Sequence, residues 1–154
     1  MSANSSIQKI AIEVDTSTIA ISNSGSITGV IAIRVGDAIF PEARWDDFPV
    51  RILSWWFQPV SRILAGKSHV WECLFMDGPY TLRLEHVQND TWTVRGFYDR
   101  RTVEFTATVS CRAFLDNLLG VSRGILRDCR QRGWQSDDID ALDKAVRNAQ
   151  REMA

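Results

Sequence analysis

Four apolar-alternating runs follow one another between His69 and Ser110, with a turn-forming sequence between each pair, and this stretch limits the fold most strongly. Large apolar residues recur at every second position from Trp71 to Phe75 and again from Tyr80 onward, after the turn Asp77-Gly78-Pro79. Period-two alternation with Gly, Asn and Asp at the turns is typical of antiparallel strands joined by hairpins. The sequence therefore predicts a four-strand meander with one buried face and one solvated face.

The two faces of this meander differ in composition. Charged residues and threonines occupy the alternate positions, so we expect a polar outer face that carries Arg83, Glu85, Arg95 and Glu104. The residues expected on the buried face are Trp71, Phe75, Leu82, Leu84, Trp92, Val94, Phe105 and Val109.

The segment before the meander predicts a hairpin and then a helix. Residues 7–21 and 27–35 are rich in β-branched residues and are separated by the loop Asn23-Ser24-Gly25-Ser26, which is typical of paired strands. Asp46 or Asp47 could then act as N-cap for a helix with Pro49 in its first turn. An interior proline costs about 3 kcal/mol in a regular helix, so Pro59 predicts a kink or break at residues 57–59.

The segment after the meander predicts two helices. Ser110 is a suitable N-cap for a helix over residues 111–132 with Gly133 as its stop, and one side of that helix is apolar enough to cover the sheet. Ser136 caps a final helix that reaches about Arg151. The expected fold is thus α+β: a mostly antiparallel sheet of about six strands, the hairpin plus the meander, with a C-terminal helix over it and a proline-kinked helix inserted after the hairpin.

The composition predicts one ordinary globular domain. A chain of 154 residues buries roughly 70% of its unfolded surface, so we expect a disordered tail at residues 1–6 and a single domain at residues 7–154. A net charge of −1 gives no field that would attract nucleic acid or an anionic membrane. The chain also shows no signal peptide and no apolar span of about 20 residues, which favours the cytoplasm.

The cysteines and histidines give no metal or cofactor motif. Cys73, Cys111 and Cys129 are odd in number and widely spaced, so they predict buried thiols in a reducing compartment, and we expect no metal and no cofactor. His69 and His86 lie about eight residues on either side of a predicted hairpin turn and could meet across it. A small RNA-cleaving or other hydrolytic enzyme built on this pair is one alternative function.

An aromatic and acidic segment is the first candidate for a protein-binding surface. A helix cannot turn all of its aromatic residues toward one sheet, so some tryptophans near the carboxylates could be exposed as anchors for a partner. The outer face of the meander is the second candidate, although ion pairs on a solvated sheet face are often only structural. The candidate residues are Glu42, Trp45, Asp46, Asp47 and Trp56 for the first surface, and Arg83, Glu85 and Arg95 for the second.

The chain is small and near-neutral, with a strand-rich body, the run WECLFMDGPYTLRLE from Trp71 to Glu85, and a terminal pair of helices. In this general plan it resembles bacterial immunity proteins. The similarity is to those of contact-dependent growth inhibition and related polymorphic toxin systems. It implies a non-enzymatic protein that binds and blocks a cognate toxin domain, possibly a nuclease. Many nuclease inhibitors are strongly acidic and this chain is not, so recognition would need a local acidic patch. A homo-oligomeric structural module that joins through exposed sheet edges is a further alternative.

Overall fold

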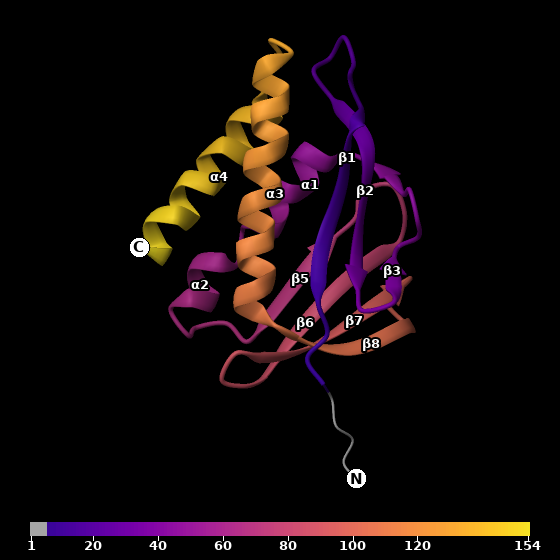
Figure 1. The fold of residues 1–154 in the computed structure, drawn as a ribbon, viewed down its shortest axis with the longest axis vertical. Helices are drawn as coiled ribbons and strands as arrows, with labels where there is room; N and C mark the ends of the chain where they lie inside the picture. The colour runs from indigo at the N-terminus through magenta and orange to yellow at the C-terminus, as the bar shows by residue number, and fades with distance from the viewer. Residues whose placement is uncertain (1–5) are drawn as a thin grey trace.

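The computed structural model describes residues 6–154, and its first sheet comes from the N-terminal part of the chain. The expected hairpin forms between β1 (Ile10–Ile21) and β2 (Ile27–Val35), which pair antiparallel. Two short strands, β3 (Ala38–Phe40) and β4 (Asp46–Asp47), pair with the free side of β2 (Figure 1). The sequence did not predict these last two strands, because neither is long enough to show a period.

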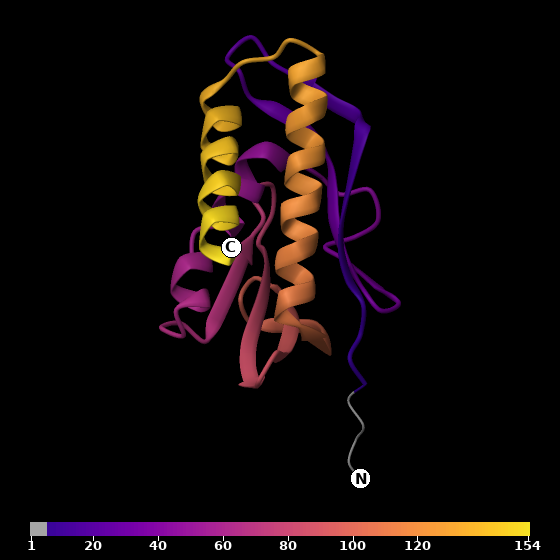
Figure 2. The ribbon, with the colours of Figure 1, turned by 60° about the vertical axis from the view of Figure 1, so that its left-hand side comes forward.

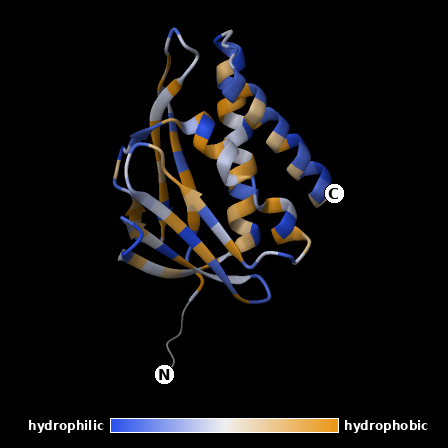
Figure 3. Ribbon diagram, turned by 180° about the vertical axis from the view of Figure 1, so that it is seen from behind, coloured by the Kyte–Doolittle hydropathy of each residue, from blue (hydrophilic) through white to orange (hydrophobic). Residues whose placement is uncertain are grey.

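The second sheet is the predicted meander. β5 (Val70–Leu74), β6 (Tyr80–Gln88), β7 (Thr91–Tyr98) and β8 (Thr102–Ser110) pair in sequence order, each antiparallel to the next. Seven of the eight side chains expected on its inner face are buried, and Phe105 is partly buried. The alternation of hydrophobic and hydrophilic residues along these strands is visible in Figure 3.

The α+β class is confirmed, but the strands form two four-stranded sheets and not one sheet of about six. A single parallel bridge between Ile7 and Thr108 joins them, where the amide of Gln8 donates to the carbonyl of Thr108 at 2.7 Å. The outer edge of β1 does not pair with the meander. The side chains of Asn117 and Arg132, from the C-terminal helical part of the chain, occupy this edge instead. Asn117 accepts from the amide of Ile12 at 2.6 Å, and the Arg132 guanidinium donates to two carbonyls of β1.

Four helices complete the fold of residues 6–154: α1 (Pro49–Trp56), α2 (Val60–Leu64), α3 (Cys111–Gln131) and α4 (Asp137–Met153). The break between α1 and α2 falls at residues 57–59, as the proline predicts. α3 runs alongside β1 and crosses the inner side of the meander, while α4 lies against α3 and α1 (Figures 1 and 2).

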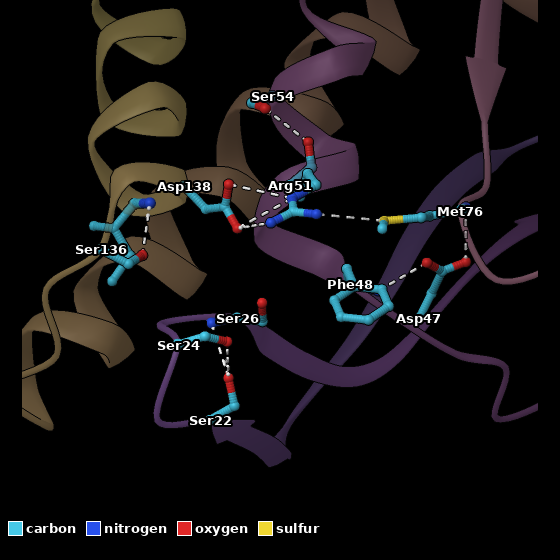
Figure 4. A network of polar contacts seen from close by, with 11 residues as sticks. Ser22, Ser24, Ser26, Asp47, Phe48, Arg51, Ser54, Met76, Ser136 and Asp138 are labelled. Carbon is cyan, nitrogen blue, oxygen red and sulfur yellow. Dashed lines mark hydrogen bonds and ion pairs between the residues drawn. The ribbon is translucent and has the colours of Figure 1, made fainter.

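The caps of the two long helices are confirmed. The Ser110 and Ser136 hydroxyl oxygens accept from the third amide of α3 and α4, respectively, and Gly133 takes a positive φ of 73° after α3. The Arg51 guanidinium pairs with Asp138 at 3.1 Å and so joins α1 to the first turn of α4 (Figure 4). Within residues 6–154, no helix is both long and apolar enough to cross a membrane.

One hydrophobic core takes buried side chains from both sheets and from all four helices. Phe40 of β3 joins the two sheets, because its ring meets those of Phe75, Tyr80 and Phe105 edge-on at 5.6–5.7 Å. Gly96 leaves room for this cluster, since a Cβ there would lie 2.5 Å from the Phe105 ring and 2.7 Å from that of Phe40.

Candidate functional site

The first predicted surface loses Trp56, because the structure buries this side chain completely. The Trp56 indole donates to the carbonyl of Leu74 at 2.9 Å, and the Trp71 indole donates in turn to the carbonyl of Trp56 at 2.8 Å. These two bonds fasten α1 to the outer edge of β5. Trp56 is therefore a core residue, and its prediction as an interface anchor is wrong, because the kinked helix turns the side chain inward.

Asp47 is also removed from that surface, since it is 1% exposed and satisfied within the chain. Its carboxylate accepts from the Trp45 indole at 2.8 Å and from the amides of Phe48, Met76 and Asp77 at 2.8–3.2 Å (Figure 4). The expected helix cap is wrong for both aspartates: the residue at the N-cap of α1 is Phe48, and no side chain caps it. Asp47 instead holds the β5–β6 turn, which lies about thirty residues away in sequence.

The remaining members of the first surface are split. Trp45 is partly buried and packs edge-on against Tyr80 at 5.3 Å, above Gly78, where a Cβ would lie 2.9 Å from the indole. Glu42 and Asp46 are exposed. The structure therefore leaves two carboxylates at this place and uses the aromatic residues for packing.

The second predicted surface is the outer face of the meander, and here the structure brings the candidate residues together. The strand register aligns Glu72, Arg83, Arg95 and Thr106 in one row across the four strands. Glu85 and Thr93 lie in the adjacent row, between Val70 and Thr108. The helices pack on the opposite face, so among the described residues this face has no covering element.

A charged cluster lies at the centre of this outer face. Glu85 accepts from Arg95 at 3.2 Å and lies 3.8 Å from the Nε atom of Arg83. All three side chains are about 40% exposed, with values of 38–42%. The cluster is therefore bonded within the chain but still open to water.

The Arg83 Nε atom is shielded from solvent and has no hydrogen-bond partner among the described residues. It borders a hollow of about 260 Å³ lined by Glu72, Thr81, Phe97 and Arg100. A buried N–H without an acceptor costs about 1–3 kcal/mol, so an acceptor that enters the hollow would recover that cost.

Apolar side chains form a further row on the same outer face. Leu74, Thr81, Phe97 and Val103 are cross-strand neighbours, and Leu74 and Val103 are 37% and 46% exposed. The sequence did not predict this row. The period places Leu74 and Phe97 outward but Val103 inward with Phe105, and the register shift between Gly96 and Phe97 brings Val103 opposite Phe97 instead. Exposed apolar area beside a charged rim is typical of protein–protein contact surfaces.

The two histidines also come together, at the other end of the meander. His69 and His86 stack with their ring centroids 5.5 Å apart and their planes 26° apart. An atom held between two rings would need a separation of roughly 7 Å, two contacts of about 3.5 Å, so no substrate atom fits between them. The pair can act on one side of a ligand, but it does not bracket one.

A pocket of about 350 Å³ opens beside this pair. α2, the start of β5, the β6–β7 turn and the first turn of α3 enclose it. Its lining is mainly apolar. Its lining includes Ile63, Leu64, His69, Trp71, His86, Asp90, Trp92, Cys111, Arg112 and Leu115.

Cys111 contributes a thiol to this pocket but not a nucleophile. Burial, and secondarily the charge of Asp90, raises the pKa of Cys111 to about 12. The reactive form of cysteine is the thiolate, so the thiol stays protonated near neutral pH. The sequence prediction of three buried, unpaired cysteines is confirmed. Over residues 6–154, no three His, Cys, Asp or Glu side chains gather closely enough to hold a metal ion.

The architecture and surface define a class: an α+β protein with two sheets around one core and an open, charged outer sheet face. In comparisons with known proteins, the chain matches no family model, no curated protein and no solved structure.

Proposed function

We propose that this chain is a non-enzymatic binding protein whose outer meander face docks against one protein partner. The observation that carries the proposal is the composition of that face. Arg83, Glu85 and Arg95 form an open charged cluster beside the exposed row of Leu74 and Val103. Partly exposed arginines with adjacent apolar area are enriched at the centres of protein interfaces.

The partner that we propose is a toxin domain, so that the chain acts as an immunity protein. The proposal is supported by the resemblance of the chain's general plan to immunity proteins, and the run from Trp71 to Glu85 that contributes to this resemblance covers most of β5, the turn and the first two thirds of β6. Arg83 is in this segment, and its uncommitted Nε–H calls for an acceptor on the partner, such as a carboxylate or a carbonyl oxygen. Binding would block the toxin sterically, without any reaction on the immunity protein.

The test is a capture experiment with tagged wild-type protein and two variants, each incubated with lysate of the source organism. The double variant Arg83→Glu/Arg95→Glu reverses the charge of the outer face. The control Arg62→Glu reverses an exposed charge on α2, which lies away from that face. Mass spectrometry then identifies the proteins that co-purify in stoichiometric amounts.

The expected result is one partner with a toxin-like domain, captured by the wild type and by the Arg62 variant and lost with the double variant. Co-expression should then protect cells from that domain in the same order. Capture that the double variant retains would move the interface to another surface. Recovery of the wild-type protein alone would contradict the proposal.

A further inference from the structure

The pocket beside the histidines is built differently from the shallow depressions on the helical side of the molecule. Trp71 and Trp92 line it together with the aliphatic side chains of Ile63, Leu64 and Leu115. Small-molecule sites are typically concave and mainly apolar, begin at about 300 Å³, and carry a few polar groups that orient the ligand. The volume of about 350 Å³ fits a small ligand with an apolar body.

The negative group at the mouth is already committed within the chain. Asp90 accepts from the amide of Arg112 at 2.9 Å and from the Ser110 hydroxyl, and its own carbonyl accepts from the amide of Cys111. Ser110 takes the next amide of α3, that of Ala113. The free amides at the start of α3 are thus satisfied, and Asp90 is the anion that satisfies them.

The nitrogen groups of this pocket come from His69, His86 and Arg112. The His86 Nε2 atom lies 2.8 Å from the carbonyl oxygen of Asn89, which can only accept, so this nitrogen carries a proton. The ring of His86 is held against Trp92, with centroids 5.4 Å apart, and His69 stacks on its other side. No side-chain bond of His69 is formed with any residue from 6 to 154. Arg112 adds a guanidinium whose counter-charge, Asp116, is exposed.

We propose that this pocket binds a small apolar carboxylate, with its hydrocarbon part between α2 and α3 and its head group against His69 and His86. The apolar lining accounts for the hydrocarbon part of the ligand, and the unbonded imidazole of His69 together with the Arg112 guanidinium accounts for the carboxylate. This site is separate from the outer meander face and does not depend on the proposed function.

The test uses 3-phenylpropionate as the probe and 3-phenylpropionamide, which has the same shape without the charge, as the control ligand. Both are titrated into the full chain and followed by heteronuclear NMR, which reports the imidazole and indole resonances separately. The protein variants are His69→Gln/His86→Gln, which removes both imidazoles, and Lys67→Gln, which removes a nearby exposed charge outside the pocket.

The expected result is saturable binding of the carboxylate, with the largest shifts at the two histidines and at the Trp92 indole. Loss of the charge-assisted bonds should weaken binding about tenfold, both for the amide and for the double histidine variant. The Lys67 variant should bind like the wild type. The NMR spectrum itself shows whether the histidine variant is folded; were it unfolded, the comparison of carboxylate with amide on the wild-type protein decides.

Three outcomes would overturn the proposal. The first is equal affinity for the carboxylate and the amide, and the second is that no shifts occur at either histidine at millimolar probe. The third is that zinc chloride alone moves both histidine resonances at micromolar concentration and displaces the probe, which would identify a metal site formed by the histidine pair.

Discussion

Asp47 and Glu85 each belong to a surface that the sequence predicts for binding. The structure buries the first carboxylate and leaves the second exposed. Asp47 is buried and accepts four hydrogen bonds, from one indole and three amides. Glu85 is 42% exposed and shares its charge between two arginines. The first carboxylate joins distant parts of the chain, whereas the second stays open to water.

The two sheets show the same contrast at their edges. The outer edge of β1 is covered by side chains of α3 and of Arg132, while the outer edge of β8 is paired, among the described residues, at Thr108 alone. An open sheet edge is a template for further pairing. The β1 edge of the N-terminal sheet is therefore covered, whereas the meander presents both an open face and an open edge at β8.

The comparison is tested most severely at Asp47. Asp47→Ala leaves the partly buried Trp45 indole N–H and three partly buried amides without their acceptor, and each shielded donor that stays unpaired costs about 1–3 kcal/mol. We expect a loss in the free energy of unfolding of at least about 3 kcal/mol, measured by urea denaturation. Asp46→Ala, the matched change at the exposed neighbour, should alter it by less than about 0.5 kcal/mol. Similar losses for the two variants would contradict the structural role of Asp47.

The covered edge of β1 gives the next largest effect. Asn117→Ala removes the acceptor of the Ile12 amide, which is 2.6 Å from it, and should cost about 1–2 kcal/mol in urea denaturation. Amide hydrogen exchange at Ile12 should become faster at the same time. The neighbouring change Asp116→Ala, which breaks only an exposed pair with Arg112, should cost about 0.5 kcal/mol or less. Unchanged exchange at Ile12 would show that the edge is protected in another way.

This contrast also explains which parts of the fold the sequence could predict. The meander and the two long helices follow from local patterns. The strands show a period of two, and the caps Ser110 and Ser136 each bond to an amide only three residues further along the chain. The separation into two sheets depends on bonds such as that between Ile12 and Asn117, which are 105 residues apart. No local pattern reports such a bond.

The candidate site was predictable to the same extent. The period placed Arg83, Glu85 and Arg95 on one face, and the register confirms that they are neighbours. It also placed the two histidines within reach of each other. The prediction of Asp47 for the first surface was wrong because its carboxylate holds the β5–β6 turn. The sequence around residues 46–49 indicates only a local role, that of a helix cap, and not this long-range contact.

A smaller effect is expected in acid, at the contact between the two long helices. Hydrogen bonds from Arg147 and Arg130 hold the pKa of Asp143 below its ordinary value. A carboxyl group whose pKa is lower in the folded state stabilises that state above its unfolded pKa, near 4, and the gain is lost as the pH falls through the folded value. Asp143→Asn should therefore lower the thermal midpoint at pH 7 and leave it nearly unchanged at pH 2. An equal loss at both values would mean that packing, and not charge, is the cause.

The smallest expected effect on stability is at the outer meander face, and it is the one that separates binding from folding. Exposed ion pairs contribute about 0–1 kcal/mol, so Glu85→Gln and Arg95→Ala should each change the free energy of unfolding by about 0.5 kcal/mol or less. The same changes should weaken capture of the partner, because an interface excludes the water that screens these charges. Urea denaturation and capture are measured on the same preparations. If the cluster serves stability, the two variants should lose stability and still capture the partner. If it is a binding surface, they should lose the partner and keep their stability.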